Sequence, residues 1–554
     1  MSFRSSIAKK FCYIFFVGAF LFVIPVAGRA DTIGQTETFN VNSKYDQFSR
    51  SSIDTTLRNI SDHAYFYVED RYWDNLNPVQ KASLTNNIIT LGQEFDSNIY
   101  PQETQFWGSE PNPGIDNDPK ITIVLEDLAL SIGGYFDTSN EYSKNVDSNS
   151  NIREMLFVGI EAGSFAKTFL GHEFQHLISY NQKELVRKVQ EDVWLNELRS
   201  EYSVSLIGYN DTFSGSNLER RVALFLDDPL DSLTEWPNVS LDYSQVAVFA
   251  EYLVEQYGQS ILSETLQGLG GGIASINGYL QNRGFSEKFS DIFESWTIAN
   301  YLNNNSLDKR YGYQRAELKN IKVTPAQSTL FYPSENNLIY SLKPWQSSWY
   351  QYNLSNLPTD KAVKIEYSPN YLVKILYTDN LGRVGILSNP GYIVNPSNLS
   401  HIVLMPINEI KTAGFGLSEE PMTVSVKISF VDNKLAQKPP NGSLIKRRGG
   451  EKEMYVVEGI YKRYLRPEII KLYGHLDVNN VIELDDAVFS SYTTANYIRP
   501  VNDKKVYAVW PDGTKHWLNM SGEYFTQSGR DWGAIFIVNE LESNSYKTGA
   551  DIIR

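Results

Sequence analysis

Hydrophobic positions recur with a helical period over much of the first three hundred residues, and short unbroken apolar runs interrupt them. Apolar side chains return every three or four positions in the segments 60–73, 241–258 and 289–302, which predicts helices there. The runs at 121–127 and 154–160 are continuous instead, and rich in Ile, Leu, Val and Phe, as in buried strands. This part of the chain is therefore predicted to be an α+β domain.

The pattern changes twice after this domain, which we place at residues 31–318. Helical periodicity disappears between 319 and 435, where short alternating runs separated by turn residues predict a β-sandwich-like domain. A linker rich in Pro and Gly at 436–443 precedes a region, 444–554, that repeats itself. We interpret this region as two copies of a unit of about 53 residues, whose shared positions form a core rather than contact a ligand. The matching positions are Tyr455, Lys462, Tyr464, Leu465, Tyr492 and Ile498 in the first copy and Tyr507, Lys515, Trp517, Leu518, Tyr546 and Ile552 in the second.

The first thirty residues have the pattern of a secretory signal peptide. A basic stretch at 1–10 precedes an apolar run at 11–26, and small residues follow up to Ala30, where we expect cleavage. An uncleaved anchor is the alternative, but the run is short for a hydrocarbon layer of about 30 Å. We therefore expect a secreted protein, extracellular or at the cell surface, with no integral membrane span after cleavage.

Composition narrows the class of protein further. A chain of 554 residues predicts three or four domains, and 42% hydrophobic residues exclude a disordered protein. The net charge of −15 argues against nucleic-acid binding, which needs a basic surface. The one cysteine, Cys12, lies inside the signal segment, so disulfide scaffolding, thiol catalysis and cysteine metal sites are excluded from the mature chain. Any metal must be bound by His and carboxylate side chains.

One predicted helix carries two histidines at the spacing of a metal site. His172 and His176 stand four residues apart, which brings both imidazoles to one helix face, a turn apart. Glu173 lies between them, which completes the H-E-x-x-H sequence of zinc hydrolases. The chain contains only 6 His, so such a pentapeptide would arise by chance in about one chain in a hundred.

A catalytic zinc ion needs a third protein ligand, and the downstream sequence limits the choice. Ser179 and Gln182 stand where a metzincin would have Gly and His, which excludes that class. Glu197 follows His176 by 21 residues, in a segment whose helical spacing presents Glu197 and Glu201 on one face. Taken alone, Glu197 would be a solvated acid on a helix.

The sequence NELRSE at 196–201 resembles the gluzincin pattern N-E-x-x-S/A-D/E about twenty residues after the histidines. That resemblance implies Glu197 as the third zinc ligand. It also implies that Glu201, one turn later, accepts a hydrogen bond from a ligand imidazole and fixes its tautomer. Leu198 departs from the pattern, because gluzincins usually carry Gly or Ala after the ligand Glu.

Seven blocks in this order resemble the hyicolysin family of bacterial zinc metallopeptidases, over about residues 50–320. The blocks are ISDHAYFYVEDRYW, DPKITIVLED, GGYFDTSNEYS, EMLFVGI, HEFQHLISYNQ, WLNELRSEY and SWTIANYL. The resemblance implies a zincin-like catalytic domain with one Zn²⁺ per chain. It does not extend to the two C-terminal regions, although the repeats resemble modules appended to other exported bacterial proteins.

The expected activity is that of an exported zinc metalloendopeptidase acting on protein or peptide substrates. Glu173 would be the general base, and Tyr243, at the start of a strong helix, either donates to the oxyanion or packs in the core. The Gly-Gly-Tyr-Phe stretch at 133–136 is either an edge strand that pairs with substrate or an ordinary turn. A non-catalytic binding protein on the same scaffold and an aminopeptidase are the alternatives. The C-terminal domains are expected to contact the cell surface.

Overall fold

The computed structural model describes residues 30–354, 357–358, 360–368, 370–387, 390–393, 398–433, 439–450, 452–474, 476 and 478–553. The predicted signal segment up to 29 and the linker residues 436–438 lie outside the described residues. The chain divides into two compact units, one running to residue 323 with 411–419 added, the other comprising 324–410 and 420–554. The segment 411–419, inside the range predicted for the β-domain, therefore groups with the first unit.

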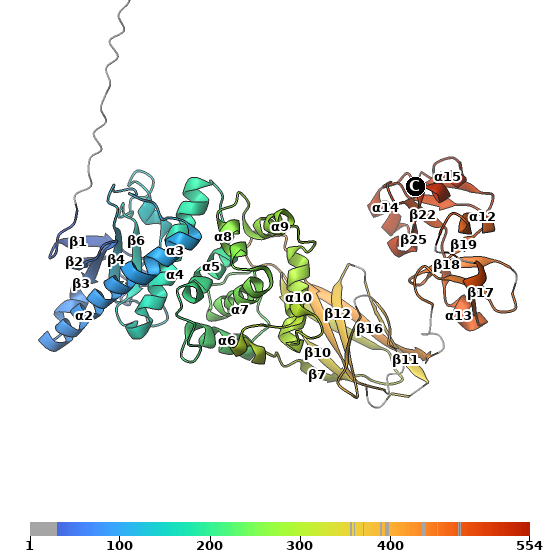
Figure 1. Ribbon diagram of the computed structural model, residues 1–554, viewed down its shortest axis with the longest axis horizontal. Helices are drawn as coiled ribbons and strands as arrows, with labels where there is room; N and C mark the ends of the chain where they lie inside the picture. Colours follow the sequence, from blue (N-terminus) through green and yellow to red (C-terminus); the bar gives the residue numbers. More distant parts are fainter. Residues whose placement is uncertain are drawn as a thin grey trace, which may run out of the picture. The chain divides into compact units, whose positions relative to one another are not determined.

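A six-stranded mixed sheet is the first layer of the first unit (Figure 1). The strands are β1 (Thr36–Asn40), β2 (Ser52–Ile60), β3 (Ala64–Glu69), β4 (Ile121–Glu126), β5 (Gly134–Phe136) and β6 (Met155–Gly159). Their order is β1-β2-β3-β4-β6-β5, with β3, β4 and β6 parallel and β5 antiparallel to β6. The short strand β5 therefore forms one edge of the sheet.

The helix predicted over 60–73 is wrong for most of its length. Residues 64–69 form the strand β3, and only the short helix α1 (Asp70–Asp74) follows. All six residues of β3 are buried, because the helix α2 (Pro78–Glu94) packs on the face that carries Phe66, and an apolar cluster covers the face that carries Tyr65 and Tyr67. A strand buried on both faces lacks the alternation of a half-exposed strand, so its apolar run resembles a helical stripe.

Two longer helices lie between β3 and β4 in the chain, and the remaining helices of the first unit follow β6 (Figure 1). They are α2 (Pro78–Glu94), α3 (Tyr100–Trp107), α4 (Ala166–Ser179), α5 (Val193–Leu206), α6 (Asn217–Asp227), α7 (Ser240–Tyr257), α8 (Ser260–Leu266), α9 (Gly272–Asn282) and α10 (Phe289–Leu302). A π-helical turn joins α2 to α3 (Phe95–Ile99), and another follows α4 (Tyr180–Val186). Helix α4 packs on β5 and β6, α5 packs on α4, and α7 packs on α5 and α6. The sheet edge and helix α5 thus pack directly on α4, and helices α2 and α3 also contact it. No helix in the described part of the chain is long and apolar enough to cross a membrane.

Two sheets with one shared core form the β-domain of the second unit. The first has the order β13-β12-β15-β10-β7, with β9 also paired to β15, and the second β14-β11-β16-β8. Side chains from both sheets meet in one apolar cluster, with Ile402 and Leu404 from one and Val424 and Val426 from the other. The strands are β7 (Ala326–Thr329), β8 (Asn336–Leu342), β9 (Gln346–Ser347), β10 (Tyr350–Asn353), β11 (Lys361–Tyr367), β12 (Leu372–Asp379), β13 (Val384–Leu387), β14 (Gly391–Ile393), β15 (Leu399–Asn408) and β16 (Met422–Asp432).

The C-terminal region contains two five-stranded sheets with equivalent strand orders, β20-β17-β18-β19-β21 and β25-β22-β23-β24-β26. Lys462 and Lys515, which occupy matching positions, both direct their ammonium groups at backbone carbonyls, of Phe489 and Tyr492 in one sheet and of Ser543 in the other. The strands are β17 (Leu444–Arg447), β18 (Met454–Glu458), β19 (Tyr461–Leu465), β20 (Ile482–Leu484), β21 (Thr493–Thr494), β22 (Tyr497–Pro500), β23 (Tyr507–Val509), β24 (Thr514–Trp517), β25 (Ile535–Val538) and β26 (Lys547–Thr548). The short helices are α12 (Pro467–Ile470), α13 (Asp486–Ser490), α14 (Gly522–Gln527) and α15 (Glu540–Ser545).

Candidate metal centre

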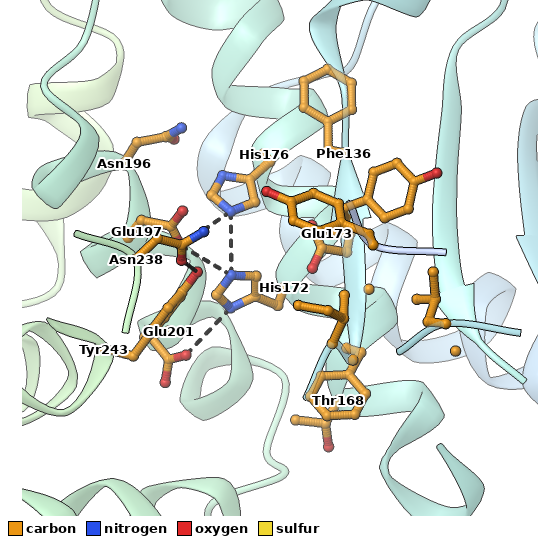
Figure 2. A pocket seen from close by; sticks show the side chains of 18 of the residues that line it. Phe136, Thr168, His172, Glu173, His176, Asn196, Glu197, Glu201, Asn238 and Tyr243 are labelled. Atoms are coloured by element: carbon orange, nitrogen blue, oxygen red, sulfur yellow. Dashed lines mark hydrogen bonds and ion pairs between the residues drawn. The ribbon is translucent and has the colours of Figure 1, made fainter. Parts of the chain in front are cut away.

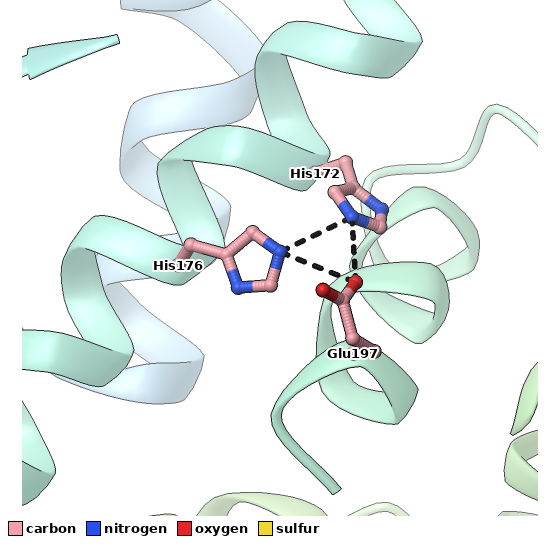
Figure 3. Close-up of side chains that lie close together, drawn as sticks. All are labelled: His172, His176 and Glu197. Atoms are coloured by element: carbon pink, nitrogen blue, oxygen red, sulfur yellow. Dashed lines mark hydrogen bonds and ion pairs between the residues drawn. The ribbon is translucent and has the colours of Figure 1, made fainter. Parts of the chain in front are cut away.

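Helices α4 and α5 bring together the three side chains that sequence reasoning selected as ligands (Figure 3). His172 and His176 project from one face of α4, and Glu197 projects from α5 toward both. His172 Nε2 lies 3.2 Å from His176 Nε2 and 3.2 Å from Glu197 Oε2, and His176 Nε2 lies 3.4 Å from that same oxygen. Three potential ligand atoms therefore form a nearly equilateral triangle.

The size of this triangle fits zinc. Zinc binds imidazole nitrogen and carboxylate oxygen at about 2.0–2.1 Å in a tetrahedral arrangement, which places neighbouring ligand atoms about 3.3 Å apart. The three measured separations, 3.2 to 3.4 Å, match that edge length. Two nitrogens and one oxygen also suit the borderline character of Zn²⁺ and leave a fourth position open.

Ser200 orients the second histidine. Its hydroxyl lies 3.1 Å from His176 Nδ1 and donates to Gln175 Oε1 at 2.5 Å. Because the Ser200 hydroxyl donates to Gln175, its oxygen accepts a hydrogen bond from the Nδ1–H of His176, and the proton that His176 can lose is the one on Nε2. Once that proton is lost, the imidazole presents the Nε2 lone pair to the metal position, as a metal needs.

Glu201 does not make the predicted hydrogen bond to a ligand imidazole. Its Oε1 lies 3.6 Å from His172 Nδ1, which is an ion-pair distance rather than a hydrogen bond. The carboxylate accepts instead from Arg221, at 2.5 Å from Nη2 and 2.9 Å from Nε, and from Asn217 Nδ2 at 2.9 Å. Three charge-assisted donors from α6 are more favourable than one imidazole, so Glu201 is fixed beside His172 and bound to α6.

Glu173 lies on the side of the histidines that faces the sheet edge (Figure 2). Burial raises the pKa of its carboxyl, although the nearby histidines act in the opposite direction. Strand β5 approaches it so closely that a Cβ on Gly134 would lie 3.0 Å from Glu173 Cγ and 2.8 Å from the carbonyl oxygen of Phe157. Glycine at 134 therefore lets the edge strand pass directly beside the acid.

Tyr243 reaches the same cavity from the first turn of α7 (Figure 2). Its ring centre lies 6.3 Å from that of His172. The hydroxyl donates to Asn238 Oδ1 at 2.8 Å. Burial raises the pKa of Tyr243, and the carboxylates of Glu197 and Glu173 raise it further, so the hydroxyl retains its proton at neutral pH.

A cavity of about 820 Å³ connects these groups. Its lining includes strand β5, the three candidate ligands, Glu173 and Tyr243. Within the described chain, this cavity thus contains every site residue that the sequence predicted, and it is bounded on one side by an unpaired strand edge.

Two of the candidate ligands also have displaced pKa values. Burial alone would lower the pKa of His176, but the adjacent charge of Glu197 outweighs it and raises the pKa to about 9. Burial would raise the pKa of Glu197, yet the two imidazoles hold it far below its usual range. In the metal-free chain, His176 and Glu197 therefore form an ion pair at neutral pH.

Sequence reasoning missed several residues that support the centre. Ser200 was part of the quoted pattern, but its contact with His176 depends on helix α5 facing α4. Arg221, Asn217 and Asn238 carry no motif at all, since each reaches the centre only through the packing of α6 and of the loop before α7. Leu198, the departure from the gluzincin pattern, is completely buried.

His172, His176 and Glu197 thus form a candidate metal site, and one comparison with a known protein points to the metalloproteases. Over 218 residues the chain is 26% identical to the neutral metalloprotease ShpI of Staphylococcus hyicus, and the aligned part covers 33% of this chain. The match spans 47% of that protein, about half its length. No protein-family model matches the chain. The similarity supports a distant relationship to metalloproteases.

Proposed function

We propose that this chain is an exported zinc metalloendopeptidase of the hyicolysin type with a zincin-like catalytic domain. The observation that carries the proposal is the triangle of His172, His176 and Glu197 atoms with the edge length of zinc ligands, in one cavity with Glu173. The resemblance to a metalloprotease supports the same class of activity. Residues 1–30 would direct export, and protein or peptide chains would be the substrates.

Each side chain has a role in this proposal. Bound zinc would polarise the scissile carbonyl and lower the pKa of a water molecule. Glu173 accepts a proton from the attacking water and returns it to the leaving amine, for which a raised carboxyl pKa is suitable. Tyr243 donates a hydrogen bond from its hydroxyl to the oxyanion that develops on the substrate carbonyl.

Strand β5 supplies a surface for the substrate backbone. It pairs with β6 on one side only, so its other edge offers backbone groups to an extended peptide. Gly134 places that edge against Glu173. A peptide paired with β5 would therefore pass the general base.

The test compares Glu173→Gln with the parent protein on two measurements. Zinc content should stay at one ion per chain, because Glu173 is not a ligand. Hydrolysis of an internally quenched peptide blocked at both ends should fall by about 10² to 10⁴, the usual contribution of a general acid-base group. Glu264→Gln, which changes an exposed acid on α8, should leave both values unchanged.

Two outcomes would contradict the proposal. A parent protein that binds no zinc would refute the metal site. A parent protein that cleaves only peptides with a free amino terminus would be an aminopeptidase rather than an endopeptidase.

A further inference from the structure

Asn238 is a cavity residue whose side chain forms a hydrogen bond with one functional group of the candidate site, the Tyr243 hydroxyl. It stands in the loop between α6 and α7, lines the cavity and accepts the Tyr243 hydroxyl proton at 2.8 Å (Figure 2). Its backbone has φ of 63°, in the left-handed region that Asn tolerates better than most residues. The loop conformation therefore directs the Asn238 amide at Tyr243.

The Tyr243 hydroxyl has a single proton, so it can donate a hydrogen bond to only one acceptor at a time. The proposed function needs that proton to point at the oxyanion, but in the structure it points at Asn238 Oδ1. A phenol oxygen can also accept a hydrogen bond, and an amide has two N–H donors on its other side. A half-turn of the Asn238 amide would place Nδ2 against the tyrosine oxygen and leave the hydroxyl proton free.

The tyrosine ring itself has no need to move. Arg221 lies over its face, with Cζ 4.8 Å from the ring centre, and Trp236 contacts it edge-on at 5.1 Å. Both neighbours hold the ring where it is, beside His172. Only the hydroxyl hydrogen and the Asn238 amide must turn, and both rotations are faster than a typical enzyme turnover.

We infer that Asn238 is a positioning residue that sets the direction of the Tyr243 hydroxyl proton. It accepts that proton in the free protein and, after its amide turns, donates to the tyrosine oxygen while the proton goes to the oxyanion. The inference deepens the proposed function and depends on it. An amide is required because it both accepts and donates, whereas a carboxylate only accepts.

Two substitutions separate these properties. Asn238→Asp keeps the shape and tolerates the left-handed backbone, but its carboxylate holds the tyrosine proton in a charge-assisted bond. Asn238→Gly removes the side chain without backbone strain, since glycine adopts positive φ readily. Asn117→Asp is the matched control, because Asn117 is an exposed loop residue with nearly the same φ, 62°.

The experiment measures kcat and KM for one blocked peptide, together with zinc content. Asn238→Asp should lower kcat by about 10 to 10², with KM and zinc content within about twofold, because removing one oxyanion donor costs up to 10² to 10³. Asn238→Gly should lower kcat by less than Asn238→Asp. It leaves the Tyr243 hydroxyl free to donate to the oxyanion, but it removes the amide that would orient that hydroxyl. Asn117→Asp should change neither value.

A double-mutant cycle with Tyr243→Phe isolates the hydroxyl. The negative charge of Asp acts whether or not position 243 has a hydroxyl, so only the coupling between the two substitutions measures the proton. Asn238→Asp should cost at least about fivefold less in the Tyr243→Phe background. Calorimetry with a phosphonate peptide, a tetrahedral anion, should show the same coupling in Kd without turnover.

Four results would overturn the inference. Asn238→Asp could cost the same factor in both backgrounds, or Asn238→Gly could cost as much as Asn238→Asp. Tyr243→Phe could leave kcat unchanged in an active, zinc-containing parent, which would end this inference and leave the peptidase function standing. A parent without zinc or peptide hydrolysis would end both.

Discussion

Replacing Ser200 and comparing the result with a matched control separates an effect on zinc affinity from an effect on folding stability. Its hydroxyl accepts the Nδ1 proton of His176 at 3.1 Å, and the side chain is completely buried. Ser200→Ala would leave that N–H without an acceptor in the interior and release the imidazole from its orientation. Loss of such an outer partner typically weakens metal binding by 10- to 100-fold, or about 1.4 to 2.7 kcal/mol. One unsatisfied buried donor lowers the free energy of unfolding by about 1–3 kcal/mol, so the loss of stability should be similar in size to the loss of zinc binding energy.

Ser203 provides the matched control on the same helix. It is also completely buried, and its hydroxyl accepts from Trp107 Nε1 at 3.1 Å, so Ser203→Ala removes an equivalent bond to an N–H outside the centre. Zinc Kd would be measured by competition with a chromophoric chelator at pH 7.5, and stability by thermal unfolding of the metal-free proteins. Both substitutions should lower the unfolding midpoint, but only Ser200→Ala should raise the zinc Kd.

The reasoning would be refuted by either of two results. A zinc Kd within twofold of the parent after Ser200→Ala would show that the contact does not orient the ligand. An equal loss of affinity after Ser203→Ala would show that zinc affinity follows general stability rather than the position of one imidazole.

Three further predictions follow from other parts of the site. His176, whose pKa is raised to about 9 because the charge of Glu197 outweighs burial, is protonated at pH 7 and must lose that proton to bind metal. Zinc affinity should therefore rise about tenfold per pH unit from pH 7 to about 9, and calorimetry in two buffers should count about one released proton; no release would contradict this. Arg221→Met leaves a buried carboxylate without its cation and should cost about 3–5 kcal/mol in urea unfolding, whereas Arg283→Met, on the surface, should leave the midpoint nearly unchanged. Equal midpoints for the two variants would be the contrary result. Gly134→Ala should abolish peptide hydrolysis because its Cβ has no room, while Gly278→Ala, in open space within α9, should raise the thermal midpoint; an active Gly134→Ala would show that β5 can shift.

The centre was more predictable from sequence than the sheet that supports it. His172, Glu173 and His176 depend on helical spacing within five residues, and local periodicity is sufficient to bring the two histidines to one face. The strand at 64–69 could not be recognised in the same way, because helix α2 covers one of its faces and an apolar cluster covers the other, and both contacts form only in the tertiary structure. Periodicity reports a half-exposed environment, and fully buried elements lack that signal.

Partners of the site side chains were the least predictable feature. The resemblance assigned Glu201 to an imidazole, but Arg221 and Asn217 on the following helix bind its carboxylate. The competition between donors depends on how α6 packs, which no local pattern encodes. The role of Asn238 could not be predicted for the same reason. Its hydrogen bond with Tyr243 forms only because Asn238 itself adopts a left-handed backbone conformation in the loop.

The two C-terminal repeats are not independent modules. Arg463 of the first is paired in the interior with Glu542 of the second, and Tyr473 donates to the same carboxylate. One apolar cluster also includes residues of both copies, among them Leu465 and Phe536. A single copy would expose part of this core and leave Arg463 or Glu542 without its partner. Gain or loss of this region in related chains should therefore occur in pairs, and limited digestion should release it as one double-length fragment.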